Sequence, residues 1–103
     1  MLNLVNKLNY IYIIIMDKPK NKPLYKPFKS TAKNKKYSVY VMKGDKKRLI
    51  HFGDSRYGQF KDKLGEYSSL DHNDPKRRKA YYSRHGQTKD KNSAKYWSHK
   101  ILW

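Results

Sequence analysis

The 103-residue sequence contains no cysteine, and this absence limits the chemistry of the chain. Without thiols it can form neither disulfides nor a zinc site built on thiolates. It also contains no glycine-rich phosphate loop of the P-loop or Rossmann pattern, and no zinc-finger, KH-loop or RNP-type sequence. The common motifs of nucleotide binding and nucleic-acid recognition are therefore excluded, and any binding function must come from other features.

Acidic residues are scarce. Eight Asp and Glu face 25 Lys and Arg, which gives a formal net charge of +17, and only 37% of residues are hydrophobic. A chain of this size and composition builds a thin core of marginal stability. So much charge of one sign repels itself unless an anion neutralises it. The candidate partners are nucleic acid, an anionic membrane surface or an acidic protein, and the alternative is a solvated, partly disordered surface.

The sequence lacks an apolar run long enough to cross a bilayer. The most apolar stretch, residues 1–15, is too short and is interrupted by Asn and Lys. It lacks the basic start and the cleavage site of a signal peptide. One interpretation places these residues upstream of the true start, at Met16. The alternatives are an interfacial anchor or an extra edge strand, but we do not expect a membrane as the main partner.

Residues 16–36 form a basic segment rich in proline and lysine. Its prolines, Pro19, Pro23 and Pro27, are spaced by four, which prevents a helix and favours an extended chain. We expect an N-terminal arm. It is either a solvated linker or an arm that condenses on phosphates or passes between neighbouring subunits.

A β-hairpin is predicted over residues 37–53. Tyr37, Val39 and Val41 alternate with the intervening residues at the period of a strand, and Gly44 supplies the turn. Residues 54–73 are irregular, with a short helix expected at about Gln59–Leu64. Five further side chains are expected to cover one side of the hairpin: Tyr57, Phe60, Leu64, Tyr67 and Leu70.

Two helices follow. Asp74 as N-cap, Pro75 in the first turn and Gly86 as C-cap predict a helix over residues 75–85. Ser93 can cap a second helix, in which Trp97 and Ile101 belong to a core-facing stripe. The sequence therefore predicts an α+β fold: a small β-hairpin covered by two short helices, residues 37–103, preceded by an extended basic N-terminal arm.

The first of these helices carries most of the arginine. Three of the five arginines, at 77, 78 and 84, lie within it. The planar guanidinium suits phosphate better than lysine does. The alternative is a solvated helix face with tyrosines in the core. The residues expected to bind nucleic acid are Arg77, Arg78, Arg84, Lys76 and Lys79 on the helix, and Lys46, Lys47 and Arg48 in the hairpin.

Other side chains suggest two further chemistries. Aromatics interleaved with cations could stack the bases of single strands, although most tyrosines are needed for the core. His51, His72 and His85 raise the possibility of a metal-dependent nuclease. The spacing of the histidines matches no known ligand geometry, so we assign no catalytic, cofactor-binding or metal-binding residue and expect no cofactor.

Three blocks of the sequence, in this order, resemble a family of small basic proteins. The blocks contain Phe52 and Gly53, then the stretch DHNDPKRRKAYYSRHG, then the tail ending in Leu102 and Trp103. The family is encoded by nucleocytoplasmic large DNA viruses, or giant viruses, and the resemblance covers roughly residues 36–103. It implies a viral origin rather than an activity.

The expected function is sequence-independent binding of nucleic acid, DNA rather than RNA, by a protein packaged in the virion and present in the host cytoplasm or nucleus during infection. One alternative is a minor capsid protein whose basic surface meets acidic capsid proteins. The other is a small metal-dependent nuclease. We expect no small-molecule substrate.

Overall fold

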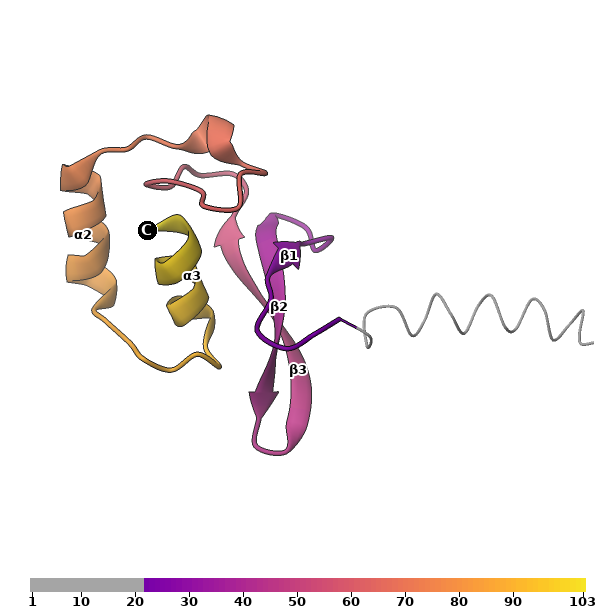
Figure 1. The fold of residues 1–103 in the computed structure, drawn as a ribbon. Helices are drawn as coiled ribbons and strands as arrows, with labels where there is room; N and C mark the ends of the chain where they lie inside the picture. Colours follow the sequence, from indigo (N-terminus) through magenta and orange to yellow (C-terminus); the bar gives the residue numbers. More distant parts are fainter. Residues whose placement is uncertain (1–21) are drawn as a thin grey trace, which may run out of the picture.

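A computed structural model of the chain describes residues 22–103. The segment 1–15 and the first residues of the predicted arm lie outside this range. The described elements are β1 (Phe28–Lys29), β2 (Lys35–Lys43), β3 (Lys46–Asp54), the 3-10 turn η2 (Ser68–Leu70), α2 (Pro75–His85) and α3 (Ala94–Leu102). Figure 1 shows the sheet on one side and the helices on the other, with α3 beside the sheet. The predicted α+β fold is confirmed.

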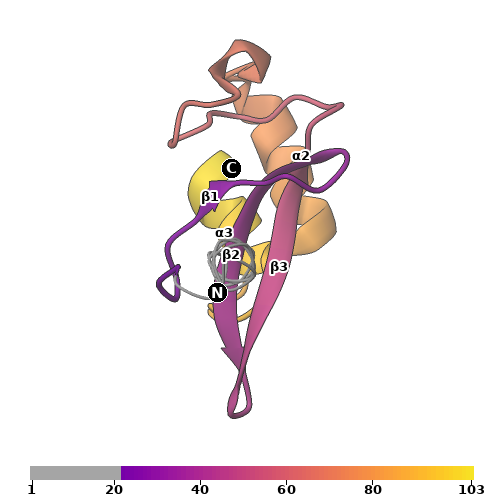
Figure 2. The same cartoon turned by 90° about the vertical axis from the view of Figure 1, so that its right-hand side faces the viewer.

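The hairpin of β2 and β3 is the centre of the sheet. The two strands pair antiparallel from Lys43 opposite Lys46 to Lys35 opposite Asp54. Gly44 in the turn adopts a φ of +66°, as predicted. Figure 2, turned by 90°, shows β1 crossing beside β2, where Phe28 pairs with Ser38.

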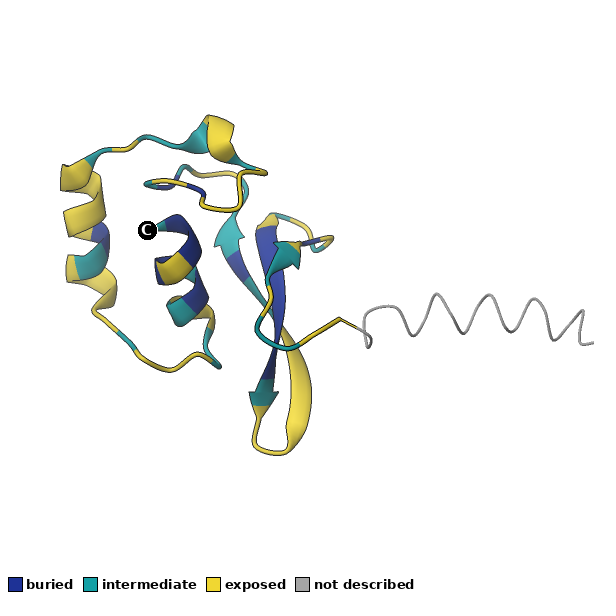
Figure 3. Ribbon diagram, viewed as in Figure 1, coloured by how far each residue is buried: buried dark blue, intermediate teal, exposed yellow. Residues whose placement is uncertain are grey.

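The described part of the predicted arm, residues 22–36, runs along the sheet. Leu24 forms a bridge with Tyr40, and the Tyr25 hydroxyl donates to the Asn92 side chain at 2.7 Å. Phe28 stacks near Tyr40, with ring centroids 6.0 Å apart. Tyr25 packs against the hydrophobic core, whereas Phe28 covers the opposite face of β2 at Tyr40. Both faces of the central strand are therefore buried, as the dark blue ribbon in Figure 3 shows.

The hydrophobic core lies between the hairpin and α3. Its buried members are Tyr37, Val39, Val41, Phe52, Trp97, Ile101 and Leu102. The alternation predicted for β2 and the stripe predicted for α3 both contribute to it. A Cβ at Gly53, where φ is +77°, would lie 2.7 Å from Leu102 Cδ1, so the absence of a side chain lets the helix approach the strand.

The segment between β3 and α2 is irregular, as predicted, but two details differ from the prediction. The helix expected at Gln59–Leu64 is wrong: this stretch is irregular, and Gln59 pairs instead with Asp71 in an isolated bridge. Main-chain bonds to Leu70 and His72 hold Gln59 in an extended conformation. The expectation that Tyr57 and Leu64 cover the hairpin is also wrong, since they are 64% and 44% exposed.

Both predicted helices are confirmed, including their caps. The Asp74 carboxylate accepts from the main-chain N–H groups of Lys76 and Arg77, and Ser93 accepts from that of Tyr96. Tyr81 is the only buried residue of α2. The rest of this helix is exposed or half-buried, and it is positioned by the few side chains described below.

Candidate nucleic-acid interface

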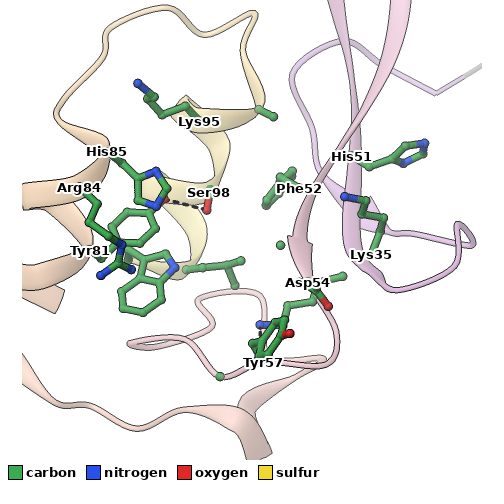
Figure 4. Close-up of a pocket in the computed structure, with 16 residues that line it drawn as sticks. Lys35, His51, Phe52, Asp54, Tyr57, Tyr81, Arg84, His85, Lys95 and Ser98 are labelled. Carbon is green, nitrogen blue, oxygen red and sulfur yellow. Dashed lines mark hydrogen bonds between the residues drawn. The ribbon is translucent and has the colours of Figure 1, made fainter. Parts of the chain in front are cut away.

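A basic groove lies between α2, α3 and the end of β3. It consists of a cavity of about 480 Å³ and a neighbouring cavity of about 290 Å³. Both are lined by Tyr57, Gly58, Arg84 and Trp103. Figure 4 shows the larger cavity, with side chains from α2, α3 and the sheet surrounding it. Residues far apart in the sequence thus meet around one hollow.

Four exposed cations line the groove. Arg77 and Arg84 come from α2, Lys95 from α3 and Lys35 from β2. Within the described part of the chain, none of these four side chains has a hydrogen bond or an ion pair to a protein group. Their charges are therefore available to an anion entering the groove.

The carboxylate of Asp54, which also lines the larger cavity, is bound by Arg56. The Arg56 guanidinium donates to both oxygens of Asp54, at 3.0 Å from Nε and 2.8 Å from a terminal nitrogen. These hydrogen bonds hold the pKa of Asp54 well below its usual range. Asp54 consequently stays ionised and bound to Arg56, and the remaining cations of the groove keep their net positive charge.

Two aromatic residues, Tyr57 and Trp103, line both cavities of the groove. Tyr57 is 64% exposed, although its main-chain carbonyl accepts a 2.8 Å hydrogen bond from the buried Lys36. Trp103 stacks on Tyr81 with the centroids 4.3 Å apart and the planes at 5°. Tyr57 is thus held through its main chain while its side chain stays largely exposed beside Arg56, whereas Trp103 is packed in place.

A buried polar network fixes the Tyr57 side of the groove. Lys36 is 1% exposed and donates to the side chain of Gln59 as well as to the Tyr57 carbonyl. Burial lowers the pKa of Lys36, while the carboxylates of Asp62 and Asp54 act in the opposite direction. The Gln59 amide donates in turn to Asp71 and to the Tyr67 carbonyl. This network orders the loop that carries Tyr57.

A second part of the network centres on Asp62. Its carboxylate accepts from the Tyr37 hydroxyl at 2.6 Å and from the main-chain N–H of Tyr67 at 2.8 Å. Burial acts to raise the pKa of Asp62, but these hydrogen bonds outweigh it and lower the pKa below its usual value. Burial raises the pKa of Tyr37, and its bond to Asp62 raises it further. The pair is therefore a neutral phenol donating to a carboxylate.

The α2 side of the groove is fixed by Tyr81. Its hydroxyl lies 2.9 Å from His99 Nδ1 and 3.0 Å from the Ser98 hydroxyl, and His99 Nε2 lies 2.9 Å from the Gly86 carbonyl. Because a carbonyl only accepts, Nε2 carries the proton and Nδ1 accepts from Tyr81. Burial lowers the pKa of His99 and favours this neutral form. The arrangement ties both ends of α2's last turn to α3.

The predicted helix residues have different surroundings. Arg77 and Arg84 line the groove. Lys76 and Lys79 are exposed on α2 but do not line it. Arg78 donates from Nε to the Trp103 carbonyl at 2.7 Å, and its guanidinium lies 4.9 Å from the Phe60 ring centroid. Arg78 therefore holds α2 against the rest of the fold.

The predicted hairpin residues lie elsewhere. Lys46, Lys47 and Arg48 occupy the start of β3, beside the turn, whereas the groove is formed at the far end of that strand. At about 3.3 Å per residue, the two ends are roughly 25 Å apart. Lys47 donates to the Lys22 carbonyl at 2.6 Å and lies over the Tyr40 ring. The structure thus separates the predicted residues into two basic surfaces.

Sequence reasoning missed Lys35, Lys95 and Tyr57 as groove residues. Nothing in the sequence distinguishes Lys35 or Lys95 from the chain's many other lysines. A local signal did exist for Tyr57: it lies between Arg56 and Gly58, in a segment without helix or strand periodicity. An aromatic side chain in such a turn is often exposed.

The three histidines considered for metal binding do not form a site together. The His51 ring lies 2.6 Å from the Ser38 hydroxyl. The His72 ring lies between Phe60 and Trp103, and the His85 ring packs on Tyr81. Residues 22–103 contain no group of three or more His, Asp or Glu side chains that could hold a metal ion. In the same range, no helix has the length and apolar character needed to cross a membrane.

Comparison with known proteins places the chain in a family. Neither the curated proteins nor the solved structures contain a match to it. The sequence model of one family, described as a family of unknown function (DUF5754), matches residues 28–85, which is more than half of the chain. The match extends from β1 to the end of α2 and so includes most of the elements that form the groove. The chain belongs to this family of unknown function, DUF5754.

Proposed function

We propose that the protein binds nucleic acid independently of sequence, through the phosphate backbone. The observation that carries this proposal is the basic groove. Four cations from three elements, Arg77 and Arg84, Lys95 and Lys35, line the two cavities of the groove, and none of their side chains has a hydrogen bond or an ion pair within the described chain. Mutual repulsion makes such an arrangement unfavourable unless an anion occupies it. The net charge of +17 favours a polyanion over a small ligand.

The mechanism follows from counterion release. Each lysine or arginine that contacts a phosphate displaces a condensed cation, so affinity falls steeply as salt rises. Arginine adds planar, paired hydrogen bonds to phosphate oxygens. Phosphate contacts carry no sequence information, which makes the binding general. Lys76, Lys79, Lys46 and Arg48 extend the contact beyond the groove, because all four are exposed.

We further propose that the protein is viral and acts on DNA, neutralising the genome inside the particle. The support is the resemblance of three sequence blocks to small basic proteins of giant viruses, together with the large positive charge. The resemblance and the match to DUF5754 cover overlapping parts of the chain. Mass spectrometry of purified particles would test this: the protein should be present in proportion to the packaged DNA.

The test of the proposed function is a salt titration. Binding to a labelled DNA is followed by fluorescence anisotropy from roughly 20 mM salt, where screening is weak, upward. The four cations of the groove predict that the logarithm of the association constant falls by at least about 3 to 4 for each tenfold rise in salt, and by more where Lys76, Lys79, Lys46 and Arg48 also contact phosphates. Failure to bind DNA at low salt contradicts the proposal. So does tighter binding of polyglutamate than of DNA at equal charge, which would indicate an acidic protein partner.

A further inference from the structure

We infer that the basic groove binds a single-stranded segment, with one unstacked base lying on the ring of Tyr57 and the neighbouring phosphates on Arg84, Lys95 and Lys35. This inference rests on the proposed function and specifies the form of nucleic acid that the groove takes. The argument uses the exposure of Tyr57, the size of the hollow and the positions of the cations.

Tyr57 differs from the other tyrosines of residues 22–103. Tyr37, Tyr40 and Tyr81 are buried, and the remaining ones are at least partly buried. Tyr57 is 64% exposed, and among the described residues no other aromatic ring packs on it. The Arg56 guanidinium lies over the ring, with its central carbon 5.6 Å from the ring centroid. At 64% exposure the residue still presents ring surface to a base, and a guanidinium over the same ring attracts a further π system.

The position of Tyr57 is fixed even though its ring is exposed. The Tyr57 carbonyl accepts from the buried Lys36, and its N–H donates to the Asp54 carbonyl at 3.1 Å. An ordered main chain lowers the entropy lost when a ligand orders the side chain. Tyr57 can thus act as a stacking platform that is largely formed before a strand arrives.

The size and walls of the groove favour a single strand. The two adjoining cavities, about 480 and 290 Å³, are in the range that holds one small organic ligand such as a nucleotide. A duplex is stiff over about 150 base pairs and keeps the faces of its bases stacked inside. Only an unpaired base can lay its face on Tyr57, as single-strand-binding proteins use their aromatics.

The cations surround this stacking position. In Figure 4, Arg84 and Lys95 extend from the two helices, and Lys35 from the sheet, around the hollow that Tyr57 borders. A flexible strand can place successive phosphates against cations on different walls. Arg77 lines the smaller cavity together with Tyr57 and Arg84, so a further phosphate can contact it there.

The experiment compares three ligands of equal length, about 10 nucleotides, within the site sizes known for single-strand binding. These are oligo(dT), an abasic oligomer with the same phosphates, and a duplex. Each is titrated at low salt against the wild-type protein, Tyr57→Ala and Tyr57→Phe. The wild type should bind oligo(dT) about tenfold more tightly than the abasic strand, as expected for one stacked base. Tyr57→Ala should reduce this ratio to about one, and Tyr57→Phe should keep it.

Equal affinity of the wild type for oligo(dT) and for the abasic strand would overturn the inference, and so would a Tyr57→Ala variant that retains the ratio. In either case salt-dependent binding to all three ligands would leave the proposed function intact. No binding to any ligand would reject both. The wild-type comparison with the abasic strand needs no variant, so the result does not depend on how Tyr57→Ala folds.

Discussion

At the scale of single residues, the fold depends on polar side chains in its interior. Lys36, Gln59 and Asp62 are 1%, 0% and 4% exposed. They form a hydrogen-bonded network rather than a hydrophobic contact, and they join β2 to the irregular segment after β3. Buried polar groups stabilise a fold only while all their partners are present. The network is thus the part of this small core most sensitive to substitution.

Gln59→Leu tests this dependence. The change keeps the approximate size of the side chain but removes one of the two acceptors of Lys36 and the donor to Asp71 and to the Tyr67 carbonyl. Because the buried ammonium of Lys36 and the carboxylate of Asp71 each lose a partner, we expect the free energy of unfolding to fall by about 3 kcal/mol, more than for one neutral hydrogen bond. Urea denaturation gives the free energy of unfolding. Gln87→Leu is the matched control because Gln87 is exposed, and an equal effect of the two changes would show that the network contributes little.

The stability of the fold should also depend on pH through His99. Burial lowers the pKa of His99 in the folded protein below its ordinary value of about 6.5. The unfolded chain therefore binds a proton more readily, and stability that is full above pH 6.5 decreases as the pH falls below it. The pKa of His72 is lowered as well, first by burial and then by Arg77, and acts in the same direction.

Thermal melts between pH 7.5 and pH 5, at roughly constant ionic strength, measure this dependence. The melting temperature of the wild type should decrease as the pH falls. The decrease should be smaller for His99→Gln, because of the two histidines with a lowered pKa only His72 remains. A wild-type melting temperature that rises on acidification would contradict the protonation states assigned to these histidines.

At the scale of elements, α2 has two roles: some of its arginines line the groove, and another holds the helix in place. Its sequence does not show which arginine has which role. The adjacent residues Arg77 and Arg78 look equivalent in the sequence, but Arg77 lines the groove and Arg78 bonds to the Trp103 carbonyl. Since α2 buries only Tyr81, the few contacts made by Tyr81 and Arg78 determine where its other cations lie.

Single alanine variants should separate these roles. Arg78→Ala should lower the free energy of unfolding by about 1 to 2 kcal/mol, because it removes a hydrogen bond and a contact with Phe60. Arg84→Ala should change the free energy of unfolding by less than about 0.5 kcal/mol. It should also reduce the slope of the logarithm of the DNA association constant against the logarithm of the salt concentration by about 1, as expected for the loss of one phosphate contact. Denaturation and salt titration of both variants provide the comparison. If Arg84→Ala is the less stable of the two, the assignment is wrong.

The same elements show what could be predicted from the sequence. The hairpin and both helices were predicted because their signals are local: alternation in β2, and the caps Asp74, Gly86 and Ser93. The irregular character of the segment 54–73 was predicted, but its path was not, because bonds such as Tyr37 to Asp62 join residues distant in the sequence. Arg77 and Arg84 were found through the clustering of arginines in one helix, whereas recognising Lys35, Lys95 and Tyr57 required the packing of three elements around them.

At the scale of the whole molecule, the described cations expected to contact nucleic acid lie near the two ends of β3. The basic groove lies at one end of β3 and the hairpin turn, with Lys46 and Arg48, at the other. Both carry exposed cations, but only the groove combines them with a hollow and an exposed aromatic ring. A long polyanion can contact both surfaces at once, and we expect the groove to provide the closer contact.

The most direct test of this account is an NMR titration of the 15N-labelled protein with oligo(dT) at low salt. The two tryptophan indole signals report on two places, since Trp103 lines the groove and Trp97 lies in the core, 4% exposed. We predict that the Trp103 indole signal and the amide signals of Tyr57, Arg84 and Lys95 shift together, while the Trp97 indole signal and the hairpin turn change much less. Shifts confined to residues 43–48, or no shifts at all, would contradict the account.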